Sequence, residues 1–154
     1  QQQQLRITRI PDSSSSKMAQ FNGRWKLVLN EGVAPFSKSI GVSDEKLVEH
    51  KDFADITKDV IEEIKCEDNK VNLKVTINGN VFRNSSLPVG PETSEPALDG
   101  RPARHVVTIS GNTMTRVQKG DNYECTYTRT VDGNNMTLTM KHGDIVATRK
   151  YVKV

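Results

Sequence analysis

Apolar and polar residues alternate along most of the chain, which is typical of β-strands with one buried face. The first such run, residues 21–29, is expected to turn four apolar side chains to one face: Phe21, Trp25, Leu27 and Leu29. Similar runs continue from residue 56 to the C-terminus, separated by Gly- and Asn-containing turns every 8–12 residues or so. Ten short strands spaced in this way predict an all-β fold, an antiparallel barrel or sandwich.

A helical insert is predicted between the first and second strands. Phe36 and Ile40 lie four residues apart, and therefore on one side of a helix that Gly41 can end. Ser43 suits the N-cap of a second short helix. A barrel of this size can enclose a ligand as well as a packed core, so the expected architecture includes a candidate cavity.

The first 17 residues differ from the rest in composition. Residues 1–4 are all Gln and residues 13–16 are all Ser, so we expect a disordered N-terminal extension, or an artefact of cloning or translation. Residues 18–154 are then expected to form the single folded domain. Three basic residues and one acidic residue give residues 1–17 a net charge of +2, out of +3 for the whole chain. The folded part is nearly neutral, which argues against a nucleic-acid partner.

Cysteine and histidine placement argues against metal, redox and catalytic chemistry. Cys66 and Cys125 form no C-x-x-C pair, and without a signal peptide they are expected to be reduced thiols in a cytoplasmic protein. His50, His105 and His142 share no metal-ligand spacing. No catalytic residue, cofactor or metal is expected, and the chain is not expected to be an enzyme.

The most informative polar residues stand near the C-terminus. Arg149 and Tyr151 are two residues apart in the last predicted strand, so their side chains point to the same face. Arg129 shares a face with Tyr127 in an earlier strand. Strand parity alone allows two interpretations, a solvated outer patch or an anchor for a carboxylate inside a barrel.

Five segments, in order and spacing, resemble the intracellular lipid-binding proteins, the cellular fatty-acid-binding and retinoid-binding proteins of the calycin (lipocalin-related) superfamily. These segments are residues 21–28, 36–42, 128–133, 136–143 and 147–151. The resemblance covers residues 18–154 and implies a ten-stranded β-clam whose opening is covered by a two-helix lid. The family's fatty-acid carriers hold the ligand carboxylate with two arginines and a tyrosine, which match Arg129, Arg149 and Tyr151 here.

Two regions, residues 33–69 and 87–102, depart from the family pattern, and both are expected around the portal. The first begins with Val33 and Ala34, where the family usually has an aromatic and an acidic residue. Residues 42–69 are longer than usual and contain a charged run, made up of Asp52, Asp55, Lys58, Asp59, Glu62 and Glu63. Residues 87–102 contain four of the six prolines, so the strand there is expected to be short or irregular.

Three functions remain open at this level. The first is intracellular binding and transport of long-chain fatty acids, with the carboxylate anchored inside the barrel. The second is transport of another hydrophobic acid, such as a retinoid or bile acid, and the third is a structural, membrane-interaction role. The expected partners are a long-chain fatty acid or similar hydrophobic carboxylate and, transiently, a membrane. A cytoplasmic monomer is expected.

Overall fold

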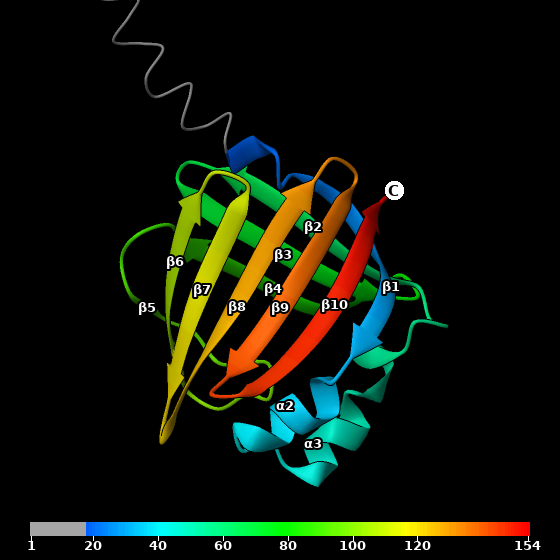
Figure 1. Ribbon diagram of the computed structural model, residues 1–154, viewed down its shortest axis with the longest axis vertical. Helices are drawn as coiled ribbons and strands as arrows, with labels where there is room; N and C mark the ends of the chain where they lie inside the picture. The colour runs from blue at the N-terminus through cyan, green and yellow to red at the C-terminus, as the bar shows by residue number, and fades with distance from the viewer. Residues whose placement is uncertain (1–17) are drawn as a thin grey trace, which may run out of the picture.

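The computed structural model describes residues 18–154 as a nearly closed barrel of ten antiparallel strands (Figure 1). The strands are β1 (Gly23–Glu31), β2 (Val60–Glu67), β3 (Lys70–Ile77), β4 (Asn80–Pro88), β5 (Thr93–Ser94), β6 (Arg104–Ser110), β7 (Thr113–Gly120), β8 (Tyr123–Asp132), β9 (Asn135–His142) and β10 (Ile145–Lys153). They form one sheet in the order β4-β3-β2-β1-β10-β9-β8-β7-β6-β5. The predicted all-β architecture is confirmed, while the prediction for residues 1–17 lies outside the described residues.

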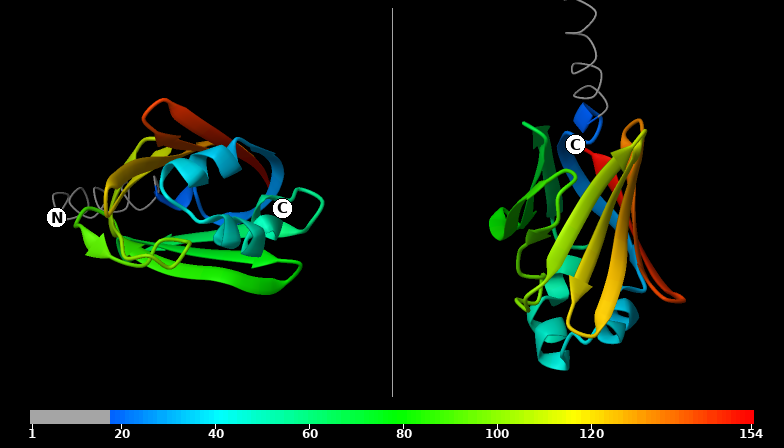
Figure 2. Two further views of the ribbon diagram at one scale, coloured as in Figure 1. Left: turned by 90° about the horizontal axis from the view of Figure 1, so that it is seen from below. Right: turned by 90° about the vertical axis from the view of Figure 1, so that its left-hand side faces the viewer.

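The helical insert lies across one end of the barrel (Figures 1 and 2). It consists of α2 (Val33–Ser39), α3 (Asp44–Glu49) and a 3₁₀ helix, η1 (Lys51–Ala54), all between β1 and β2. The Ser43 hydroxyl caps α3 by accepting a hydrogen bond from the Lys46 backbone N–H at 3.2 Å. The two predicted helices are therefore confirmed, and η1 extends the insert further over the opening.

A bulge in β1 changes which side chains of that strand face inward. The register between β1 and β10 shifts between Leu27 and Leu29. Leu29 therefore lies opposite the exposed Lys150, and Asn30 lies opposite the buried Arg149. The prediction that Leu29 shares the face of Leu27 is wrong, because one extra residue inverts the alternation beyond it. The bulge thereby brings a polar amide to the inner side of the barrel.

The proline-rich stretch, residues 87–102, is irregular as predicted. β4 ends at Pro88, and only Thr93–Ser94 pairs with β6 as β5. The barrel closes there through an isolated bridge between Val89 and Val107 instead of a full strand pair. Proline has no backbone N–H to give to a ladder, which accounts for the weak seam.

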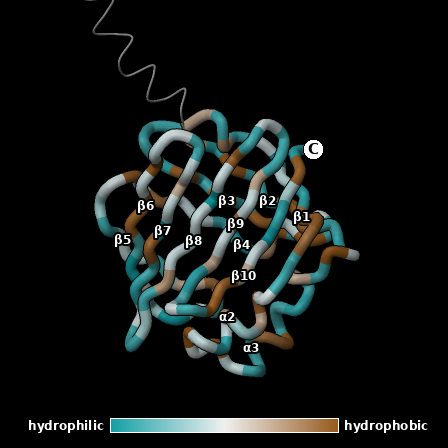
Figure 3. Tube along the Cα trace, viewed as in Figure 1, coloured by the Kyte–Doolittle hydropathy of each residue, from teal (hydrophilic) through white to brown (hydrophobic). Residues whose placement is uncertain are grey.

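The packed core reaches from the start of β1 to the helical insert, which contributes Val33, Phe36 and Ile40. Trp25 is completely buried there, and its indole N–H donates to the Phe21 carbonyl at 2.9 Å. Apolar and polar residues alternate along the strands in Figure 3, as expected for a sheet with one buried face. Cys125 is buried and Cys66 partly buried, and both are free thiols. The helix end of the barrel is less filled, and it holds the cavity.

Candidate functional site

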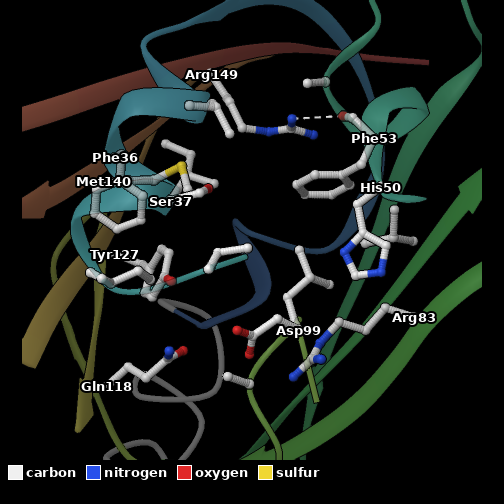
Figure 4. Close-up of a pocket in the computed structure, with 18 of the residues that line it drawn as sticks. Phe36, Ser37, His50, Phe53, Arg83, Asp99, Gln118, Tyr127, Met140 and Arg149 are labelled. Carbon is white, nitrogen blue, oxygen red and sulfur yellow. Dashed lines mark hydrogen bonds between the residues drawn. The ribbon is translucent and has the colours of Figure 1, made fainter. Parts of the chain in front are cut away.

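A cavity of about 180 Å³ lies inside the barrel beneath the helices (Figure 4). Most of its wall is apolar and comes from the helical insert and the inward faces of the strands. Its apolar side chains include Phe36, Ile40, Phe53, Leu73, Val75, Leu138 and Met140. Such a wall suits a hydrophobic ligand, and the polar groups set into it determine which head group it accepts.

The cavity wall carries more positive than negative charge. Five arginines contribute to it: Arg83, Arg101, Arg116, Arg129 and Arg149. Arg83 lies 3.6 Å from Glu95, and Arg101 lies 2.6 Å from Asp99, so each of these two has its own carboxylate. The remaining three share one carboxylate, that of Glu62, which leaves an excess of two positive charges.

The structure brings the three predicted site residues together inside the barrel. Arg149 and Tyr151 are almost completely buried, and the Arg149 Nε–H donates to the Tyr151 hydroxyl at 2.8 Å. Arg129, also buried, joins them through Glu62. Glu62 Oε1 accepts from Arg129 Nε at 2.7 Å, and Glu62 Oε2 accepts from the Tyr151 hydroxyl at 3.1 Å. A carboxylate of the protein itself thus occupies the centre of this group.

Glu62 is charged in spite of its burial. Burial alone would raise the pKa of Glu62, but the charge and hydrogen bond of Arg129 outweigh it, so that the pKa is lowered. Burial, together with the Glu62 charge, raises the pKa of Tyr151 to about 12. Tyr151 is therefore neutral at neutral pH and keeps the proton that it donates to Glu62.

Arg149 ties the buried charges to the helical insert. Its Nη1 donates to the Asn30 side-chain oxygen and to the Phe53 carbonyl oxygen, both at 2.7 Å. The Phe53 ring lies over the guanidinium, 3.8 Å from Cζ to the ring centroid (Figure 4). Its Nη2 is buried and has no hydrogen-bond partner. Arg149 thus holds η1 in place over the cavity.

Sequence reasoning missed the role of Glu62. The interpretation of this residue as part of a charged run around the portal is wrong, because its side chain is only 2% exposed. The available signal was strand parity, since Glu62 alternates with the buried Val60 and Ile64, whereas Glu63 is exposed on the other face. A carboxylate on an apolar strand face indicates a buried partner of opposite charge.

A second polar group, also missed, surrounds Arg116 on β7. Its Nη1 donates to His105 Nδ1 at 2.9 Å and to Gln118 Oε1 at 3.0 Å, and its Cζ lies 4.1 Å from the Tyr127 ring centroid. An arginine only donates, so His105 Nδ1 is the acceptor and Nε2–H donates to the Glu95 carbonyl at 2.9 Å. Burial and the Arg116 charge lower the pKa of His105, which is therefore neutral.

Residues 18–154 contain neither a membrane-spanning helix nor a cluster of metal-ligating side chains. No helix in this part of the chain combines the length and the apolar character needed to span a membrane. No group of three or more His, Cys, Asp or Glu side chains within it is placed to hold a metal ion.

Comparisons with known proteins find several fatty-acid-binding proteins among the relatives of this chain. Fatty acid-binding protein homolog 6 of Caenorhabditis elegans is 30% identical over 139 residues, covering 87% of this chain and 97% of that protein. Homolog 5 of the same organism is 30% identical over 147 residues, covering 87% and 96%. A Schistosoma mansoni fatty acid binding protein in complex with arachidonic acid superimposes with a TM-score of 0.77 at 25% identity, covering 90% of this chain and 98% of that one. No protein-family model matches the sequence.

Proposed function

Because the chain belongs to the fatty-acid-binding protein family, we propose that it binds and carries long-chain fatty acids inside its barrel. The observation that carries this proposal is a mostly apolar cavity with five guanidinium groups in its wall, two more than the carboxylates that pair with them. The relative solved with arachidonic acid supports a ligand of this class. The proposed role is reversible binding, without a chemical step.

The two ends of a fatty acid match two different parts of the cavity. Each methylene of the acyl chain gains about 0.8 kcal/mol when it is buried against an apolar wall. A carboxylate in the same dry space is stable only when it is paired and hydrogen-bonded. Guanidinium groups supply both, since they stay charged and offer two parallel N–H groups.

In this proposal the carboxylate is anchored by the group that contains Arg129, Arg149 and Tyr151. Arg129 makes the direct ion pair, because only its Nε is bonded to Glu62 and its terminal nitrogens have no partner within residues 18–154. Arg149 and Tyr151 lie behind it, holding Glu62 and keeping this end of the cavity positive. Arg129 and Tyr151 already hold the Glu62 carboxylate in its charged form. This supports the idea that the same group of residues favours a ligand with a carboxylate.

Calorimetric titration of delipidated protein with palmitate and with hexadecanol tests this function. We expect palmitate to bind near 1:1 and hexadecanol at least about 10-fold more weakly, because the alcohol lacks the charge-assisted hydrogen bonds. Equal affinity for the two would contradict an anionic head-group site, and binding of neither would contradict the function. Retinoate displacing palmitate at a much lower concentration would instead favour a retinoid carrier.

A further inference from the structure

We propose that Arg116 is a ligand-binding residue and that the fatty-acid carboxylate lies between Arg116 and Arg129. This inference rests on the proposed function and specifies its head-group position. Arg116 is not one of the three residues indicated by the family resemblance, and it approaches the cavity from β7. Three features lead to it: the occupied donors of Arg149 and Tyr151, the free edge of Arg116, and the closeness of Arg116 to Arg129.

Arg149 and Tyr151 have few donors left for a ligand. Arg149 Nε and Nη1 are bonded to Tyr151, Asn30 and Phe53, and the remaining Nη2 is buried out of reach of a water-sized group. The single Tyr151 hydroxyl proton goes to Glu62, and Tyr151 does not contribute to the cavity wall. A ligand carboxylate would have to displace Glu62 to reach either residue.

Arg116 presents an unused pair of donors to the cavity. Both Nη1 hydrogens are accounted for, by His105 and Gln118. Within residues 18–154, Nε and Nη2 have no hydrogen-bond partner, and neither is among the atoms sealed from solvent. Nε–H and one Nη2–H form the parallel edge of a guanidinium that binds a carboxylate in a bidentate manner. No carboxylate of the described residues forms an ion pair with Arg116.

Arg129 is the nearest inward-facing cation to Arg116 on the neighbouring strand. Arg116 lies directly opposite Tyr127 on β8, and Arg129 follows two residues later on the same face. Such diagonal neighbours are roughly 7–8 Å apart at the backbone, a span that one carboxylate can bridge from two long side chains. Burial lowers the pKa of Arg116, and the Arg129 charge lowers it further, so an anion between the two relieves repulsion.

The Arg116 side chain is also held in position before any ligand arrives. It stacks on Tyr127 and is hydrogen-bonded to His105 and Gln118, and Gln118 in turn donates to the Tyr123 hydroxyl at 2.9 Å. A guanidinium fixed in this way loses little freedom when it binds an anion. A residue needed only for packing would not have to be charged, and a charge without a counter-ion inside the barrel is costly.

The test compares Arg116→Gln with Arg24→Gln, using palmitate and hexadecanol as probes of the full chain. Arg24 is exposed on the outside of the barrel, does not contribute to the cavity wall and pairs with the exposed Glu63 at 3.8 Å, so its variant makes the same chemical change away from the cavity. For Arg116→Gln we expect palmitate binding to weaken by about 10- to 100-fold and hexadecanol binding by less than about threefold. Arg24→Gln should leave both within about threefold. Unchanged palmitate affinity in Arg116→Gln would overturn the inference.

A measurement on the unmodified protein tests the same inference without requiring the Arg116→Gln variant to fold. In side-chain ¹⁵N NMR, palmitate should shift the Nε–H resonance of Arg116, while that of Arg149, bonded to Tyr151, should stay nearly unchanged. The opposite pattern would place the carboxylate at Arg149 and overturn the inference while leaving fatty-acid binding intact. Absence of palmitate binding to the unmodified protein would instead refute the proposed function.

Discussion

Replacing Glu62 with Gln tests how the barrel balances its internal charge. Gln has nearly the same shape and keeps one acceptor, but it leaves the Arg129 guanidinium without the counter-ion now 2.7 Å away. Removing one partner of a buried ion pair typically destabilises a protein by about 3–5 kcal/mol. Since the Gln oxygen still accepts one hydrogen bond, we expect the lower end of that range, about 3 kcal/mol.

The stability lost in Glu62→Gln should depend on pH. Burial raises the pKa of Glu62, but the Arg129 charge outweighs burial and lowers the pKa below 4.5, the value expected for the unfolded chain. A group whose pKa is lowered on folding contributes its full stabilisation above the unfolded value and loses it as the pH falls through the folded value. The difference between wild type and Glu62→Gln should therefore be largest above pH 4.5 and shrink in stronger acid.

Urea unfolding at pH 7 and pH 3 measures both effects. Trp25 is the only tryptophan and is completely buried, so its fluorescence reports unfolding directly. For an m-value of about 2 kcal/mol/M, the expected loss moves the midpoint at pH 7 by about 1.5 M. Glu63→Gln is the matched control and should leave the midpoint unchanged, since Glu63 is exposed and its pair with Arg24 is solvated. A Glu62→Gln midpoint within about 0.3 M of wild type at pH 7 would refute the reasoning.

Three further predictions concern separate features. Asn30→Ala removes the acceptor for Arg149 Nη1 and should lower stability by about 1.5–3 kcal/mol in urea unfolding; no loss would mean that water replaces the amide. Gly32→Ala should lower Tm more than Gly79→Ala. Both glycines have positive φ, but only at Gly32 would the added Cβ meet a carbonyl oxygen, at 3.0 Å. Equal losses of Tm would exclude that contact as the cause. Burial raises the pKa of Cys66 to about 11, so its alkylation rate in the native protein should still rise steeply between about pH 9 and 10. Peptide mass spectrometry measures this rate, and a plateau near pH 9 would contradict the raised pKa.

Strand order and side-chain parity could be predicted where the strands are regular. The register of β9 with β8 and with β10 continues without a shift, so simple alternation correctly grouped Arg129 with Tyr127 and Arg149 with Tyr151. Parity could not decide which face is inside, and only the family resemblance indicated the interior. That these side chains bind a ligand remains a prediction.

The features that sequence reasoning missed depend on contacts across the barrel. Glu62 and Arg129 are 67 residues apart and belong to β2 and β8, which are not neighbours in the sheet, so no local pattern marks their pairing. The bulge that turns Asn30 inward lies at Val28, between Leu27 and Leu29, and an apolar residue there suits either face equally well. The environment of Arg116 likewise requires the curvature that brings several strands around one cavity.

The contact between Arg149 and Phe53 has a consequence for how fast the cavity exchanges its contents. Phe53 belongs to η1, which covers the helix end of the cavity, and it is held by a hydrogen bond to a charged group and by stacking on that group. Any displacement of η1 must break both contacts, which adds roughly 2–4 kcal/mol to its barrier and slows that displacement by about 30- to 1,000-fold. A single buried guanidinium thus sets how rarely this part of the cover opens.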